Sequence, residues 1–214
     1  MSGYFTSASN LLRLGGLAAM VGGVLFLAFP FVGLVGYLFL YLGLPDRDYP
    51  VLYVLYGVSS VVAFLLVPVG MVGIHVLQRH SYGREALFGF WLVVVGSLVV
   101  LGGVVFFTLG ESEDVLQATP PLVWVALGLL GLVVGLVSMV VGFALYGVAT
   151  LQAKVLPRWC GVAFIAALPV ALALSVSLHF SSMFLVFGLA WLALGYALWA
   201  RREAPAVQQP RRVR

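Results

Sequence analysis

Six long apolar stretches whose interiors hold no charged residue constrain the fold of this chain more than any other feature. They cover residues 11–44, 51–77, 85–109, 122–150, 157–177 and 182–200, and about 20 apolar helical residues are enough to cross a bilayer core of about 30 Å. A chain that is 63% hydrophobic and 8% charged cannot cover the surface of a soluble domain. The sequence therefore predicts an all-α polytopic membrane protein, with residues 11–200 forming six transmembrane helices as three antiparallel hairpins.

The two ends of the chain are short and polar. Residues 1–10 are expected to form a cytoplasmic lead in which Ser7, Ser9 and Asn10 cap the first helix, and residues 201–214 a basic, disordered cytoplasmic tail. The first apolar stretch is much longer than the core of a signal peptide, so we expect it to remain as a mature span. A single cysteine excludes an intramolecular disulfide.

The first stretch is too long for one straight span. More than thirty helical residues would extend about 50 Å, against a hydrocarbon core of about 30 Å. We expect Pro30 to bend or break the helix, because it removes the bond to the carbonyl of Phe26, so that residues 31–44 lie along the outer interface or project beyond it. An alternative with seven spans divides the stretch at Phe29 and Pro30, but it needs a 14-residue span and a turn without polar residues.

The distribution of charge predicts the orientation. With six spans and a cytoplasmic N-terminus, ten of the 11 basic residues lie on the cytoplasmic side and only Arg47 lies outside. Both termini are therefore predicted to be cytoplasmic. The cytoplasmic ends of the three hairpins also share basic residues and glycines, which fits either an internal repeat or the common need for basic anchors at helix ends.

Small residues follow one face of the third and fourth stretches. Steps of three and four residues separate Gly128, Gly131, Gly135, Ser138 and Gly142, and steps of seven separate Gly89, Gly96 and Gly103. In lipid such faces let two helix backbones approach closely. The pattern predicts helix packing, and a ligand groove along the fourth stretch is the alternative.

Two prolines favour a site in the middle of the membrane. Pro68 and Pro169 lie near the predicted midplane and free the carbonyls of Phe64 and Ile165, and Ser138 could add a hydroxyl group there. Transporters place substrates at broken helices of this depth. The sequence thus supports, as its second hypothesis, a small-solute transporter or channel subunit.

The interiors of the apolar stretches lack the residue types that usually catalyse reactions within the membrane. No ionisable group lies at mid-span, and the H-E-x-x-H and G-x-S-x-G motifs are absent. Met71 and His75 lie one turn apart, as do His179 and Met183, but interfacial packing explains each pair better than copper or haem does. We therefore expect no catalytic residue, no metal and no cofactor, and a protein that is not an enzyme.

Three segments resemble a broad group of uncharacterised six-span proteins of actinobacteria and related bacteria. The segments are residues 13–17, residues 156–161 and residues 188–199. The resemblance implies a bacterial inner-membrane protein with both ends cytoplasmic, and it brings no active-site residues. Our first hypothesis is a membrane module that binds a lipid, an apolar ligand or a membrane partner. The partner would be another membrane protein or a second copy of the chain. We expect no binding of nucleic acid.

Overall fold

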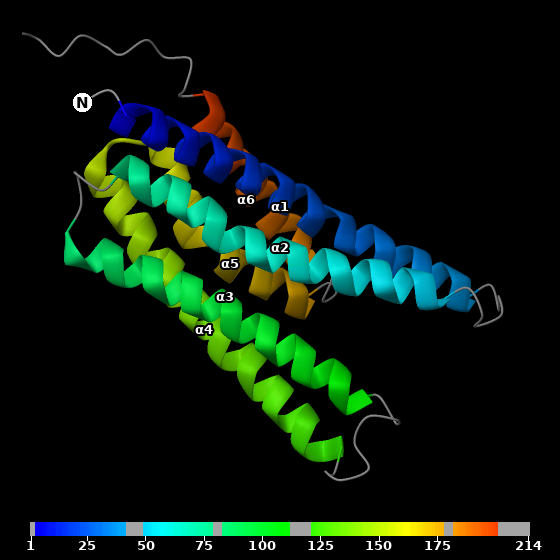
Figure 1. Cartoon of the computed structure of the whole chain (residues 1–214). Helices are drawn as coiled ribbons and strands as arrows, with labels where there is room; N and C mark the ends of the chain where they lie inside the picture. Colours follow the sequence, from blue (N-terminus) through cyan, green and yellow to red (C-terminus); the bar gives the residue numbers. More distant parts are fainter. Residues whose placement is uncertain (1–2, 42–48, 79–82, 112–120, 178–181, 201–214) are drawn as a thin grey trace, which may run out of the picture.

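The computed structural model describes residues 3–41, 49–78, 83–111, 121–177 and 182–200. It describes side chains for residues 10–31, 55, 57–78, 83–106, 122–174 and 183–200. The described chain is all-helical and contains no strand. The helices are α1 (Gly3–Tyr41), α2 (Tyr49–Gln78), α3 (Arg84–Glu111), α4 (Pro121–Ala153), α5 (Arg158–Ser177) and α6 (Ser182–Ala200) (Figure 1).

Five of these helices are long and apolar enough to cross a membrane, and the described part of α5, Arg158–Leu174, is a shorter apolar helix. The ends of α2 to α6 lie within about three residues of the predicted ends. The agreement follows from polar residues and prolines that stand between the apolar stretches. The prediction of an all-helical protein built for a membrane is confirmed.

Helix α1 corrects two expectations. It begins at Gly3, so Ser7, Ser9 and Asn10 lie inside the helix and are not its caps. It also continues past Pro30 to Tyr41, so the expected break is wrong and no turn divides Phe29 from Pro30. Proline removes one hydrogen bond, whereas ending a helix in hydrocarbon leaves four carbonyls without partners, so continuation costs less.

The six helices pack in a ring that divides into two groups. Helix α1 packs extensively against α2 and α6, and α4 packs extensively against α3 and α5. The contacts that close the ring, α2 with α3 and α5 with α6, are smaller. We call α1, α2 and α6 the first group, and α3, α4 and α5 the second group. In Figure 1 the α1–α2 pair and the α3–α4 pair converge near the N-terminus and diverge toward their other ends.

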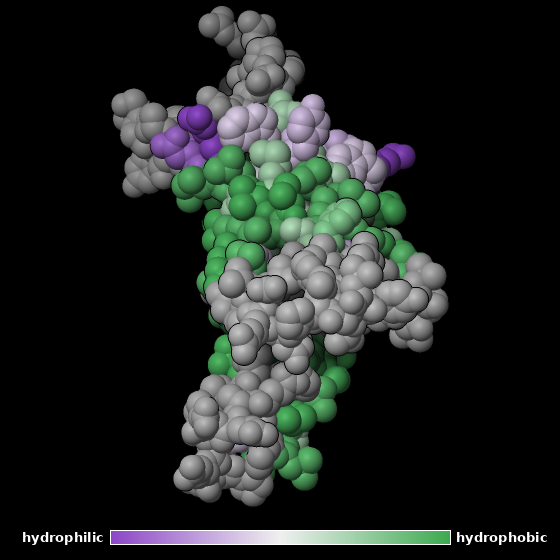
Figure 2. Space-filling view, turned by 90° about the vertical axis from the view of Figure 1, so that its right-hand side faces the viewer, coloured by the Kyte–Doolittle hydropathy of each residue, from purple (hydrophilic) through white to green (hydrophobic). Residues whose placement is uncertain are grey.

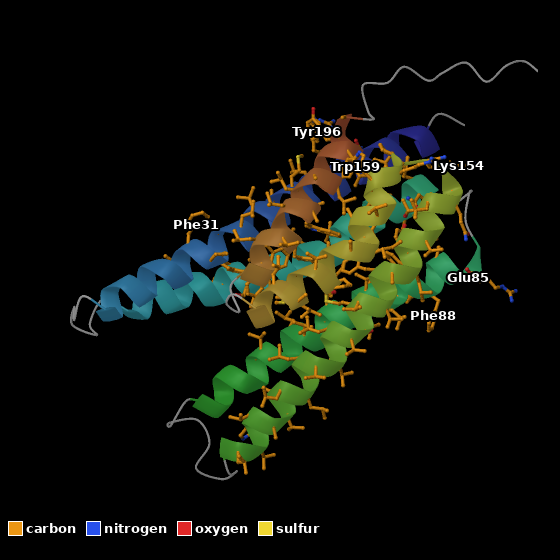
Figure 3. All side chains as sticks on the ribbon, turned by 180° about the vertical axis from the view of Figure 1, so that it is seen from behind. Phe31, Glu85, Phe88, Lys154, Trp159 and Tyr196 are labelled. Carbon is orange, nitrogen blue, oxygen red and sulfur yellow. The ribbon has the colours of Figure 1, made fainter. Side chains whose placement is uncertain are left out.

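Charged side chains gather at one end of the bundle, which we call the polar end. Arg13, Glu85, Lys154 and Arg158 are exposed there, and Figure 2 shows hydrophilic residues at one end of a largely hydrophobic surface. Figure 3 places Glu85, Lys154 and Trp159 at this end, with Phe31 distant from it. The opposite end, where α5 ends and α6 begins, is called the far end.

Glycine pairs set the spacing inside each group. A Cβ atom on Gly89, Gly96 or Gly103 of α3 would lie 2.9 Å from a backbone carbonyl oxygen of α4, and the three carbonyls belong to Gly142, Gly135 and Gly128. In the first group, a Cβ on Gly23 of α1 would lie 2.8 Å from the carbonyl oxygen of Gly188 of α6. Steps of seven residues along antiparallel helices thus bring backbone against backbone.

Candidate functional site

The remaining small residues of the fourth stretch also face α3. A Cβ on Gly131 would lie 3.0 Å from the Cα of Gly103, and the hydroxyl of Ser138 donates a hydrogen bond to the carbonyl oxygen of Leu92 at 2.9 Å. This face of α4 is therefore covered by α3. It is not an open groove.

Aromatic rings fill the space between the two helix groups. Phe26 contacts the rings of Phe64 and Phe187 with centroid distances of 5.2 and 5.0 Å, and Phe143 contacts Phe187 and Trp191 at 5.8 Å in each case. Phe187 and Trp191 stack at 5.9 Å with an interplanar angle of 11°. Rigid rings that meet edge to face leave gaps where flexible side chains would close them.

Two cavities lie within this aromatic region. The first, which we call the far cavity, has a volume of about 10 Å³, room for roughly one water molecule, and is lined by Phe26, Phe64, Leu136, Met139, Leu168, Met183, Phe184 and Phe187. These residues belong to every helix except α3. The second, the middle cavity, also has a volume of about 10 Å³ and is lined by Phe143, Ala163, Phe164, Ala167, Leu168, Phe187, Ala190, Trp191 and Leu194.

The two cavities share Leu168 and Phe187, so they are neighbours separated by these side chains. Neither lining contains a charged residue, a hydroxyl or a side-chain amide. The indole Nε1 of Trp191 is buried without a hydrogen-bond partner, and it faces α1, 3.4 Å from where a Cβ of Gly22 would lie. The cavities are therefore small packing voids between apolar side chains, far below the 300 to 1,000 Å³ typical of drug-sized ligand sites.

The predicted midplane residues do not share either cavity. Phe64 lines the far cavity, whereas Pro68 is half-buried in α2 and Pro169 is exposed on α5. Ile165 packs where a Cβ of Gly147 would lie, at 2.6 Å, and Ser138 is bonded to α3. Of these five residues, Phe64 alone lines one of the two cavities, and the midplane site stays a prediction.

A buried polar contact joins the two groups near the polar end. Gln78 of α2 is 0% exposed and Thr150 of α4 is 1% exposed. The amide Nε2 of Gln78 donates to the Thr150 hydroxyl at 3.1 Å, and that hydroxyl donates to the carbonyl oxygen of Tyr146 at 2.8 Å. Sequence reasoning missed this contact, although two polar side chains at the ends of apolar helices were its visible signal.

Met71 and His75, one of the two Met–His pairs in the sequence, pack against neighbouring side chains. Met71 is 0% exposed, and the ring of His75 lies 4.6 Å from that of Phe90 on α3. Among the described residues no group of three His, Cys, Asp or Glu side chains could hold a metal ion. His179 lies outside the described residues, and Cys160 is buried.

Comparison with protein-family models, with curated proteins and with solved structures found no match to this chain. The resemblance to six-span bacterial proteins stays a prediction.

Proposed function

We propose that this protein is a six-span membrane protein that performs no catalysis and binds a membrane partner, a second copy of this chain, along α4. One observation carries the proposal: only 22% of the apolar span of α4, Leu122–Ala153, is buried, against 39 to 50% of the other four candidate spans. The proposal keeps the predicted orientation, with both termini cytoplasmic, and the bacterial inner membrane as its location.

The exposed face of α4 is apolar. Leu130, Val133 and Val137 are 60, 59 and 58% exposed, and their spacing of three and four residues places them on one side of the helix. In lipid, helices associate through close van der Waals packing, so a second helix on this face gains contacts of that kind.

A bulky substitution on this face tests the proposal. Val133 is 59% exposed on α4, and Val95 is 50% exposed on α3. We expect native mass spectrometry of the wild-type protein, released gently from detergent, to show a complex of two copies. Val133→Trp should lower the fraction of the complex because its larger side chain keeps a second helix away, and the matched control Val95→Trp should not.

Equal fractions of the complex in both variants would contradict the proposed face. A protein that stays monomeric would contradict the proposal and favour the second candidate, a small transporter. One observation supports that candidate: the proline-containing helices α2 and α5 each take part in one of the smaller contacts that close the ring. Flux into liposomes would then be the next measurement.

A further inference from the structure

Backbone contacts hold the helices of each group together. In the first group, a Cβ on Gly15 of α1 would lie 2.5 Å from the Cα of Gly73 on α2, and one on Gly195 of α6 would lie 2.8 Å from a carbonyl oxygen of α1. In the second group, α3 meets α4 at the three glycine pairs, and a Cβ on Gly147 of α4 would lie 2.8 Å from the carbonyl oxygen of Gly161 on α5. Where two backbones touch, no side chain lies between them that could rearrange, so each group forms a rigid unit.

The contacts between the two groups are made by side chains. Each glycine of the described helices that would bring a Cβ within 4 Å of another helix finds its nearest atoms in its own group. Across the boundary, Phe143 of α4 meets the rings of Phe187 and Trp191 on α6 at 5.8 Å, and His75 of α2 meets the ring of Phe90 on α3 at 4.6 Å. Side chains can move between staggered rotamers, so helices that they separate can shift against each other.

Both cavities lie on this boundary. The far cavity is lined by Leu136 and Met139 of the second group and by Phe26 and Phe64 of the first, among others. The middle cavity lies between α4 and α5 on one side and α6 on the other. A void of about 10 Å³ is too small for a ligand, but it deprives the atoms around it of dispersion contacts. The boundary is therefore packed less closely than the glycine contacts inside each group.

One end of the boundary is held by a polar contact. Gln78 and Thr150, which are 0 and 1% exposed, join α2 to α4 near the polar end through their hydrogen bond of 3.1 Å. Separating them would leave an amide unpaired among apolar side chains, which costs free energy. At the other end, the α1–α2 and α3–α4 pairs diverge (Figure 1).

We infer that the two groups tilt against each other as rigid units about the contact between Gln78 and Thr150, so that their boundary opens and closes at the far end while the polar end stays closed. Val58 of α2 lies 20 residues from Gln78, or about 30 Å along the helix, and Val105 of α3 lies across the boundary toward the same end. A tilt of about 10° would change the distance between the two helices there by about 5 Å.

The distance between two spin labels on one chain, measured by double electron–electron resonance, tests this motion. Val58 and Val105 are 57 and 45% exposed, so V58C and V105C in a C160S background carry labels toward the far end without filling the core. The full-length protein is placed in lipid nanodiscs and diluted with unlabelled protein, so that a second copy adds no distance. We expect a distance distribution that is about 5 Å broader than that of either of two control pairs.

The two control pairs locate the motion. F31C and V58C lie on α1 and α2 within the first group, and F88C and Y196C lie on α3 and α6, on opposite sides of the boundary toward the polar end (Figure 3). Phe31, Phe88 and Tyr196 are 63, 61 and 64% exposed, so labels at these positions leave the core intact. Both distributions should be narrow, with only the width that the rotamers of the label give.

Each other outcome overturns the inference. A far-end distribution as narrow as both controls would show one fixed arrangement of the two groups. A broad distribution for F31C with V58C would show that the first group is not rigid, and one for F88C with Y196C would show that the polar end does not stay closed. In Gln78→Leu the polar-end pair should broaden because the hydrogen bond is lost, and an unchanged width would overturn the assignment of the pivot.

Discussion

At Gly103 the absence of a side chain determines how closely α3 and α4 approach. A Cβ there would lie 2.7 Å from the amide nitrogen of Leu132 and 2.9 Å from the carbonyl oxygen of Gly128. At the neighbouring Gly102 a Cβ would meet nothing within 4 Å. Of these two adjacent glycines, only Gly103 is needed for the close approach of α3 and α4.

We expect Gly103→Ala to lower the free energy of unfolding by about 1 to 3 kcal/mol, the usual cost of an extra carbon in a packed core. Gly102→Ala is the matched control and should leave stability unchanged or raise it by up to ~1 kcal/mol, because alanine is the better helix former. Unfolding in mixed micelles measures both. Equal effects of the two variants would show that backbone contact at Gly103 does not limit the packing.

At the scale of the helices, Gln78 and Thr150 connect α2 to α4 across the group boundary. Both side chains are buried among apolar neighbours, so an unpaired amide would cost free energy there. The bond therefore fixes the relative position of two helices whose other contacts are few.

A double-mutant cycle measures this connection. Gln78→Leu and Thr150→Val should each destabilise the protein, and the coupling between them should be about 0.6 kcal/mol and no more than about 1.7 kcal/mol, the range found for hydrogen bonds between membrane helices. The cycle compares the free energies of unfolding of the wild type, the two single variants and the double variant. Strictly additive effects would mean that the contact contributes nothing to stability.

The sequence predicted the helices better than it predicted their partners. Polar residues between the apolar stretches mark where the helices end, but nothing in the sequence shows that α1 continues through Pro30. The helices are apolar on every side, so their residue pattern does not separate the face toward lipid from the face toward protein. Glycines seven residues apart predicted the packing face of α3, and small residues three and four apart predicted that of α4, whereas the match between Gly23 and Gly188 required the structure.

The cavities were harder still to predict. Their lining residues are Phe, Leu, Met, Ala and Trp, the commonest residues of any membrane helix. Phe64 was singled out because of the neighbouring Pro68, not because of the aromatic cluster that it joins. A cavity results from the fit of several helices, and the sequence of one helix does not contain that fit.

For the whole molecule, orientation is the property that chemistry in intact cells can test. In a C160S background, the exposed Lys154 at the polar end and Ser112, which follows α3 in the sequence, can each be changed to cysteine. We expect a membrane-impermeant maleimide to label S112C in intact cells and to label K154C only after permeabilisation. The reverse pattern would place the polar end outside.

The unequal helix lengths have a consequence for the surrounding membrane. Helix α4 has 33 residues and would extend about 50 Å, whereas α5 has 20 residues and would extend about 30 Å. The bilayer accommodates such mismatch by tilting the longer helices or by changing its own thickness locally, at a fraction of a kcal/mol per Å. A thicker membrane should therefore draw the diverging pairs upright and bring them together, and a thinner one should spread them apart, so bilayer thickness becomes a variable that adjusts the shape of this protein.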